Sequence, residues 1–552
     1  MLFRREQLTL LAWLLLAYLV SALFLAWMLV NHDYEAEYLA LGNLVVRGEL
    51  SLYQDEMRGQ WVPLPFYVYG LFQAVFGPSL LAARLLSIAL GGVVLVLVFV
   101  LANRWGGALA GTVAGALFCT QGLVLGYFST VHFAGLVALL HLLGIYVLFC
   151  TDWPRRDLLA MAIVSVLFLV KPNYWPTIAL VWLFLVWRAG SGRERIAITS
   201  VALAIPVVFF ASDPDHVKLF AYVPILRDWV EPLGYRSWYS LTEDAAHAAA
   251  SDYVDIPWET SFWGRTVPVL KTIPFILKRY AVWMTTLAGL AALLVWRARG
   301  AWGARGLWGP PGVRFTFWMF WYVVAAQFVM LGPYSKQTIG FVGAVAPLLA
   351  VAIGWLFAVV WERQALPRPA RIGLAGGLVL ALVVSPWVHR TPILPRTVSW
   401  ADATIPVLRR AADRMAALIP PGEKRVFSIA DPMPVYLANR QTYLQQFSQH
   451  KFVFTSLRDR TRYARVGMWG PSELEEWLGS DAQYAILELD VVRFYRSRAP
   501  YREILAGMDA LLEENFTLVE TVKAVSGDAF LIYRRRSLDT RGTAALRTPG
   551  DD

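Results

Sequence analysis

Long uncharged apolar runs fill the chain as far as Val388 and then stop. A helix needs about 20 apolar residues to cross the roughly 30 Å hydrocarbon layer of a bilayer. Eleven runs come near or exceed that length, at about 8–30, 79–102, 107–125, 131–150, 158–170, 174–187, 196–211, 280–296, 315–332, 338–361 and 372–388. With 57% hydrophobic and 16% charged residues, the chain is no single soluble globule. The sequence predicts a polytopic α-helical membrane protein.

Arginines mark alternate ends of these runs. Basic residues concentrate in the cytoplasmic connections of membrane proteins, so these ends are predicted to be cytoplasmic. The arginines concerned are Arg4, Arg5, Arg104, Arg155, Arg156, Arg188, Arg193, Arg195, Arg297, Arg299, Arg305, Arg314, Arg363, Arg368 and Arg371. In a cell (inner) membrane, an odd number of spans then leaves the N-terminus in the cytoplasm and the chain after His389 outside. Because the bases behind the net charge of +10 lie in short connections and form no stripe, we expect no nucleic-acid partner.

One apolar segment, Pro63–Gly77, is too short for this scheme. It has 15 residues, with two prolines and two glycines. A crossing here would invert every later connection and move the arginines outside. We therefore expect an interfacial helix that lies on the outer leaflet.

The fifth and sixth runs, 158–170 and 174–187, are predicted to form a hairpin rather than one kinked helix. Arg156 and Arg188 flank the pair and must share a side. Each run spans only about 20 Å at 1.5 Å per residue. The tip, Lys171–Asn173, should then lie below the outer membrane surface, where a lysine needs a partner or a wet cavity.

The remaining parts are predicted to be soluble. Residues 31–78 and 212–278 are outer loops of a membrane domain that covers 1–388, residues 389–536 form an extracytoplasmic α/β domain, and residues 537–552 are expected to be disordered. The α/β domain begins with an amphipathic helix whose apolar face carries Ile405, Leu408, Ala412, Met415 and Leu418. Strands follow at 425–430, 452–455, 484–489, 517–522 and 529–533, with helices at 472–479 and 502–515.

The densest polar cluster, His32–Tyr38, comes directly after the first run. A helix that begins near Asp33 would carry Asp33 and Glu37 on one face, with Glu35 between them in sequence. Two carboxylates that close can share a proton or a divalent cation, and one can become a base near neutral pH. Acids also favour helix N-termini for structural reasons. The spacing alone leaves both interpretations open.

A longer set of residues resembles a known family. Asp33, Tyr38, Gly48, Tyr53 and Asp55 are followed by Trp61–Pro65, by Ala82–Leu85 and later by Lys171–Pro172. In order and spacing these residues resemble the polyprenyl-phosphate-sugar-dependent glycosyltransferases of the GT-C superfamily, among them the protein mannosyltransferases and aminoarabinose transferases. The resemblance covers roughly residues 8–190.

The resemblance implies an enzyme that moves a hexosyl or pentosyl group from a lipid-linked phosphate to an acceptor on a glycan, lipid or protein. The family's first-loop catalytic aspartate corresponds to Asp33. Tyr34 follows it where the family usually has a second acid, which leaves Glu35 or Glu37, or neither, as the replacement. Since a sugar phosphate already carries a good leaving group, one general base for a single inverting displacement is enough.

The departing phosphate gathers negative charge, so cations should face it. Candidates on the outer side are Lys171 at the hairpin tip, Arg84 near the start of the second run, Lys336 in a tight turn at 332–337, and Arg279 where the eighth run begins. Arg84 could instead reach lipid headgroups, and Lys336 and Arg279 could be ordinary interface anchors. Lys171 is the strongest candidate, because a buried lysine without a function is costly.

Three rival functions stay open, one of which is a scaffold or sensor that acts through the soluble domain after the last run. A transporter is also polytopic, but it usually carries ionisable groups or broken helices at mid-membrane and often has repeated halves. The runs here are almost free of charge, and no halves match. Another outer-leaflet glycan ligase or a phosphotransferase would need the same base and cations as the proposed enzyme.

Overall fold

The computed structural model describes residues 4–28, 33–53, 62–222, 280–298, 309–331, 335–362, 367–388, 405–447, 454–458, 460–463, 468–524 and 527–536. These residues form two compact units. The first combines the described residues of Met1–Met28, Arg84–Pro214 and Glu259–Arg396. The second combines those of Leu29–Ala83, Asp215–Trp258 and Thr397–Asp552.

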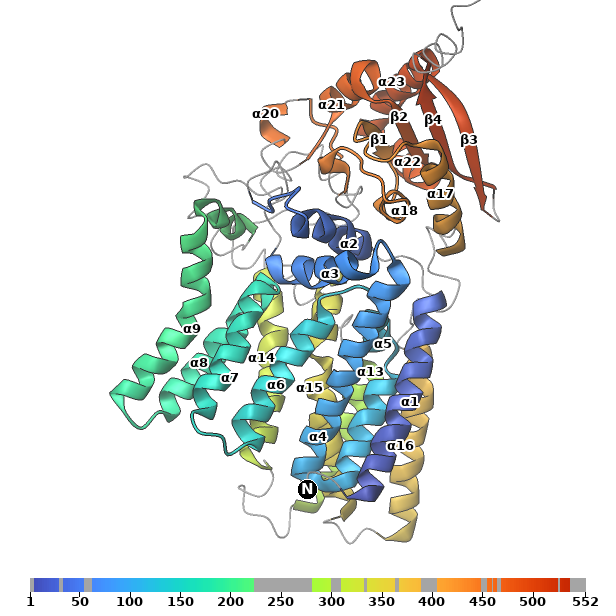
Figure 1. Cartoon of the computed structure of the whole chain (residues 1–552). Coiled ribbons are helices and arrows are strands. Elements are labelled where there is room, and N and C mark those ends of the chain that lie inside the picture. Colours follow the sequence, from blue (N-terminus) through green and yellow to red (C-terminus); the bar gives the residue numbers. More distant parts are fainter. Residues whose placement is uncertain are drawn as a thin grey trace, which may run out of the picture. The chain divides into compact units, whose positions relative to one another are not determined.

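The first unit is a bundle of helices (Figure 1). They are α1 (Arg5–Met28), α4 (Leu80–Thr120), α5 (Gly122–Ser129), α6 (Ala134–Cys150), α7 (Arg156–Ser165), α8 (Trp175–Arg188), α9 (Gly192–Ser212), α13 (Ala281–Ala298), α14 (Pro311–Leu331), α15 (Ser335–Glu362) and α16 (Arg368–Val388). Two 3-10 helices, η1 (Val166–Leu169) and η2 (Pro172–Tyr174), lie between α7 and α8. A further 3-10 helix, η3 (Pro214–Tyr222), follows α9 and belongs to the second unit from Asp215 on. Each of the eleven predicted runs falls on a helix, so the polytopic helical fold is confirmed.

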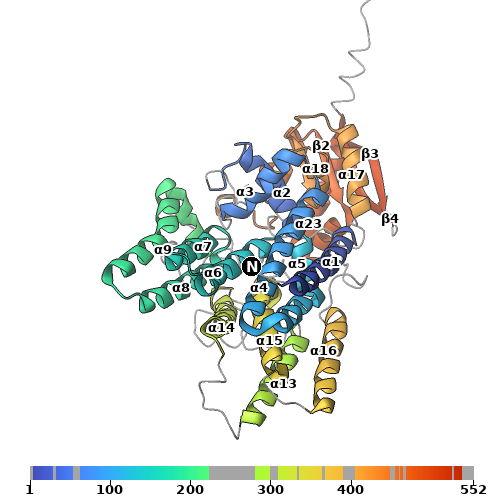
Figure 2. The same cartoon turned by 60° about the horizontal axis from the view of Figure 1, so that its bottom comes forward.

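Burial separates the centre of this bundle from its rim. The helix α15 is buried along its whole stretch from Val342 to Val360 and contacts α5, α6, α13 and α14 (Figure 2). The helices α1, α9 and α16 expose much of their apolar surface, as expected of helices that face lipid. Among the described residues, five helices are long and apolar enough to cross a membrane by length and composition: Arg5–Trp27, Leu80–Thr120, Gly192–Ser212, Val342–Glu362 and Arg368–Ser385. The number of crossings stays a prediction.

Two glycines divide α4 into two helices. Gly106 and Gly107 leave the helical dihedral angles, and Gly107 has a φ of 74°, a value that glycine adopts without strain. A Cβ on Gly111 would lie 3.0 Å from the carbonyl oxygen of Phe99, and a Cβ on Gly115 would lie 3.4 Å from Leu95. The two halves are therefore antiparallel neighbours, which agrees with separate runs at 79–102 and 107–125.

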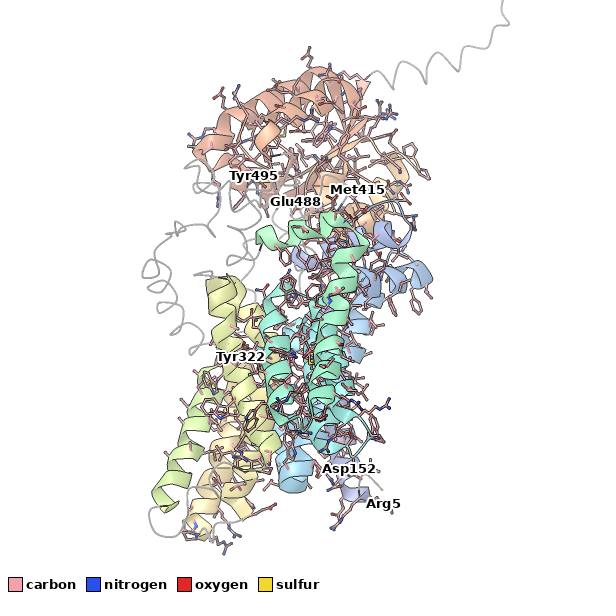
Figure 3. All side chains as sticks on the ribbon, turned by 90° about the vertical axis from the view of Figure 1, so that its left-hand side faces the viewer. Arg5, Asp152, Tyr322, Met415, Glu488 and Tyr495 are labelled. Atoms are coloured by element: carbon pink, nitrogen blue, oxygen red, sulfur yellow. The ribbon has the colours of Figure 1, made fainter. Side chains whose placement is uncertain are left out.

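The predicted hairpin of the fifth and sixth runs is also present. α7 continues into η1, and the chain turns at Lys171 into η2 and α8. Asp157 accepts a 2.7 Å hydrogen bond from Arg188 and lies 3.9 Å from Arg156. The two arginines therefore share one end of the hairpin, as predicted. Figure 3 shows Arg5 and Asp152 toward the same end of the first unit, whereas Tyr322 lies nearer its middle.

In the second unit, α2 (Asp33–Val46) and α3 (Pro63–Phe76) form a close helical pair. The predicted helix at Pro63–Gly77 is thus confirmed as a helix. It carries four exposed apolar side chains: Tyr67, Leu71, Val75 and Phe76. That exposure agrees with an interfacial helix, whose contact with lipid stays a prediction.

The described residues of the second unit from Ile405 on form the α/β domain (Figure 1). Its sheet has the order β1-β2-β4-β3, with β1 (Val426–Ile429) parallel to β2 (Tyr484–Glu488) and both β2 and β3 (Phe516–Ala524) antiparallel to β4 (Gly527–Arg535). The helical segments are α17 (Ile405–Leu418), α18 (Pro432–Leu437), η7 (Leu444–Phe447), α20 (Arg460–Tyr463), α21 (Pro471–Glu476), a π-helical turn (Trp477–Asp481), α22 (Leu489–Arg496) and α23 (Ala499–Asn515). On α17, Leu408, Ala412 and Met415 are buried as predicted.

The predicted strand at 452–455 is described only in its second half, where no strand forms. Residues 452 and 453 lie outside the described residues, and Phe454 makes only an isolated bridge with Trp469. The outer edge of β1 is instead covered by a side chain, because the Ser428 amide donates a 2.8 Å hydrogen bond to Oε1 of Gln446. The other four predicted strands overlap β1, β2, β3 and β4.

Candidate active site

The candidate carboxylates belong to α2 in the second unit. The helix begins at Asp33, as predicted, so Asp33 and Glu37 are four residues apart on one helix. The side chain of Asp33 lies outside the described residues. Glu35 is 0% exposed and Glu37 is 2% exposed. A buried carboxylate needs polar or charged partners, and neither glutamate is without a partner.

Close packing fixes α2 in the second unit. The helix is buried from Glu35 to Val45. The ring of Tyr38 lies 5.0 Å from Phe66 edge-on and 6.2 Å from Tyr69 in a stacked arrangement. An amphipathic surface helix would leave one face to water, whereas α2 is enclosed by protein. A carboxylate at its first turn is therefore carried by a rigid element.

Lys171 occupies the hairpin tip in the first unit. Its backbone is extended, with a φ of −167°, and its side chain is half-buried. The ammonium group lies 5.5 Å from the ring centroid of Phe133, within cation–π range. Gln327 on α14 donates a 2.9 Å hydrogen bond to the carbonyl oxygen of Asn173 and so ties the tip to the bundle. The structure keeps a cation at this tip beside an aromatic ring.

Aromatic and hydroxyl groups that the sequence interpretation missed accompany this lysine. Tyr174 is fully buried, and the hydroxyls of Tyr127 and Tyr280 lie near enough to interact with it electrostatically. The indole of Trp175 stacks on Phe168 with centroids 4.6 Å apart and donates to its carbonyl oxygen. The only signal in the sequence was the position of Tyr174 directly after the tip. The polar residues of the tip thus pack against buried aromatic side chains.

Arg84 is more deeply placed than predicted. It is 0% exposed, and one guanidinium nitrogen donates a 2.6 Å hydrogen bond to the carbonyl oxygen of Ala26 in the last turn of α1. A cation is favoured at a helix C-terminus. This arginine therefore caps α1 and does not extend to lipid headgroups as a snorkelling side chain would.

Two further predicted site residues, Arg279 and Lys336, are not fully described. Arg279 lies outside the described residues, as do residues 332–334 of the predicted turn and the side chain of Lys336. The backbone of Lys336 already belongs to α15, which begins at Ser335, so the predicted turn at 332–337 does not extend to Gln337. His132, at the start of the fourth run, accepts a 3.1 Å hydrogen bond from the Ala134 amide, and its ring makes tilted contacts with the rings of Tyr127 and Phe133.

No metal-binding cluster is found within the described part of the chain. There, no three His, Cys, Asp or Glu side chains are grouped as metal ligands would be. Glu35 and Glu37 therefore gain no third ligand of these kinds from other described residues.

Comparison with solved structures identifies the fold. The crystal structure of ArnT from Cupriavidus metallidurans bound to undecaprenyl phosphate matches with a TM-score of 0.53 at 14% identity, over 95% of this chain and 97% of that one. The apo crystal structure of the same protein gives a TM-score of 0.51 at 16% identity, over 94% and 97%. The chain has the fold of the GT-C membrane glycosyltransferases. No protein-family model and no curated protein matches the sequence.

Proposed function

We propose that this protein is a membrane glycosyltransferase that moves a sugar from a polyprenyl-phosphate donor to an acceptor on the outer face of the cell membrane. The observation that carries the proposal is the fold shared over nearly the full length of both chains with ArnT, which was crystallised with undecaprenyl phosphate. The acidic helix after the first apolar helix and the cation at the hairpin tip support it. The acceptor is a glycan, a lipid or a protein.

The reaction needs one base. The acceptor nucleophile attacks the anomeric carbon, the bond from that carbon to the phosphate oxygen breaks, and its electron pair leaves on the polyprenyl phosphate. Asp33 takes the proton from the acceptor, and the configuration at the anomeric carbon is inverted. Glu35 and Glu37 follow Asp33 on α2, and both are buried. A tightly packed helix holds its carboxylates in a fixed orientation, as a general base requires.

Cations supply the second requirement. Charge that develops on the departing phosphate is stabilised by groups already oriented toward it. Lys171 is assigned this role first, because its ammonium group is half-buried and held over an aromatic ring. Arg84 is assigned a supporting role, since its guanidinium has five donors and also caps α1. Lys336 and Arg279 stay candidates from the sequence.

The distribution of buried charge favours an enzyme over a transporter. Among the described residues of the first unit, Arg84 is the buried member of the Asp, Glu, Lys and Arg side chains. Arg84 lies in the first turns of α4 rather than at the middle of a helix. His141, which is buried within α6, is hydrogen-bonded to the Val137 carbonyl oxygen and the Thr177 hydroxyl. A transporter that couples ion movement needs ionisable groups at mid-membrane. An enzyme that works near one membrane surface needs no ionisable groups at mid-membrane.

A panel of donors tests the proposal. Purified protein is incubated with several polyprenyl-phosphate sugars and a membrane fraction as acceptor source, and released polyprenyl phosphate is quantified. We expect at least one lipid-linked donor to raise the melting temperature and to be consumed, whereas nucleotide sugars do neither. Consumption of nucleotide sugars alone, or of no donor at all, contradicts the proposal.

A further inference from the structure

The helix that begins at Asp33 is fixed by the α/β domain, more than 350 residues later in the chain. Within the second unit, the Tyr436 hydroxyl on α18 donates a hydrogen bond to Oε1 of Gln73 on α3. The same oxygen accepts a 2.8 Å hydrogen bond from the Ser79 amide, at the end of the loop after α3. Gln73 is 2% exposed and Tyr436 3% exposed. Burial makes this contact costly to lose.

A second contact joins the α/β domain to the segment directly after α2. Glu49 follows α2 by three residues, accepts a 2.9 Å hydrogen bond from Gln441 and lies 3.6 Å from the ammonium group of Lys424. Arg47, the residue after α2, acts electrostatically on the Tyr436 hydroxyl. Two contacts at different points oppose rotation of the helical pair better than one contact would.

The contact comes from the edge of the sheet where α/β domains usually bind ligands, the carboxyl ends of parallel strands. The chain leaves β1 at Asp431, whose amide donates a 2.7 Å hydrogen bond to Glu488 at the end of β2. The Asp431 side chain accepts from the Met433 amide and so begins α18. α18 then packs on α2. In the second unit, this edge of the sheet instead carries α18, which packs on α2.

We propose that Tyr436 is a positioning residue, through which the α/β domain fixes α2 and with it the carboxylates at the start of that helix. The catalytic part of this inference rests on the proposed function; the docking part does not. Burial raises the pKa of the Tyr436 phenol above its ordinary value, so the hydroxyl stays a neutral donor across the working pH range. Removal of that hydroxyl loosens α2 without removing any group that touches the donor.

The test uses the full-length protein in nanodiscs with Tyr436→Phe, Gln73→Leu and the double variant. Tyr501→Phe is the matched control, because its hydroxyl also makes a buried hydrogen bond in the α/β domain, to the carbonyl oxygen of Phe454, but none to α3. Hydrogen exchange of the amides of residues 33–46 reports docking. Donor turnover, with kcat and KM separated, reports catalysis on the donor that the unmodified protein consumes.

We expect Tyr436→Phe to speed exchange in α2 about tenfold and to lower kcat about tenfold while the donor KM stays within twofold. The double variant should change exchange and kcat by less than the two single variants combined, because each single variant already removes the same hydrogen bond. Tyr501→Phe should leave α2 exchange and kcat unchanged. Unchanged α2 exchange in Tyr436→Phe overturns the docking, and faster exchange with unchanged kcat overturns the positioning role. If the unmodified protein consumes no donor, the proposed function fails, and exchange alone still decides the docking.

Discussion

Gly42 on α2 and Gly70 on α3 meet backbone to backbone. A Cβ on Gly70 would lie 2.2 Å from the carbonyl oxygen of Gly42, and a Cβ on Gly42 would lie 2.6 Å from the carbonyl oxygen of Phe66. Backbone atoms cannot move aside as the end of a side chain can. Glycine at both positions therefore allows α2 and α3 to approach as closely as they do in the second unit.

Gly70→Ala should push the two helices apart and destabilise the protein. Overpacking of a tight contact costs about 1–3 kcal/mol, more than the ~0.5–1 kcal/mol that alanine gains over glycine within a helix. Thermal unfolding in nanodiscs should show a melting temperature several degrees lower. Gly507→Ala in α23 is the control, because a Cβ there meets nothing within 4 Å, and its melting temperature should stay equal or rise. A Gly70→Ala protein as stable as the control would contradict the close packing.

Lys171→Met should weaken donor binding. Hydrogen bonds to charged groups contribute about 1.5–3 kcal/mol, so the donor KM or Kd should rise about ten- to a hundredfold. Lys171→Arg should recover part of the loss, because the charge is kept. Lys523→Met, at an exposed position on β3, is the control. Equal donor affinity in Lys171→Met and the control would exclude this lysine from phosphate binding.

The Glu49 contact should weaken in acid. The hydrogen bond from Gln441, together with the charges of Lys424 and Arg47, lowers the pKa of Glu49 below its ordinary 4.5 despite partial desolvation. A carboxyl with a lowered folded-state pKa contributes stability that is complete above its unfolded pKa and is lost as the pH falls through the folded value. Protection of α2 amides, corrected for intrinsic exchange, should therefore fall below pH 4.5, and fall less in Glu49→Gln. Identical pH dependence in both proteins would count against the contact.

Fusions to a reporter test the predicted orientation. A phosphatase fused after Arg536 should be active, since the α/β domain is predicted to lie on the extracytoplasmic side of the membrane. The same phosphatase fused after Glu362, at the end of α15 where Arg363 follows, should be inactive. The reverse pattern would invert the orientation and contradict the assignment of Lys171 to the outer side.

Local pattern predicted most of the first unit because every helix there carries its own signal. Apolar runs of span length gave the helices, and Arg156 and Arg188 gave the hairpin that Asp157 joins. In the second unit, the acidic residues after the first run are typical of a helix N-terminus, and α2 begins at Asp33. Each of these features depends on residues close together in sequence.

Contacts between segments far apart in the chain could not be predicted from local sequence pattern. Nothing around Gln73 indicates that its amide oxygen accepts a hydrogen bond from Tyr436, 363 residues later. The apolar stretch at Phe454 looked like a strand, because composition does not distinguish a strand from a buried connection. For Arg84 the sequence indicated phosphate binding or contact with lipid headgroups, but not the hydrogen bond that its guanidinium donates to the carbonyl oxygen of Ala26.

The most direct measurement compares donor turnover by Asp33→Asn with that by Asp152→Asn, whose carboxylate is fully exposed between α6 and α7. A general base contributes about 100- to 10,000-fold to a rate. Asp33→Asn should therefore lose at least about 100-fold in kcat while it binds the polyprenyl-phosphate donor with unchanged KM, and Asp152→Asn should match the unmodified protein. Turnover by Asp33→Asn at the rate of the unmodified protein would contradict the role of Asp33 as the base.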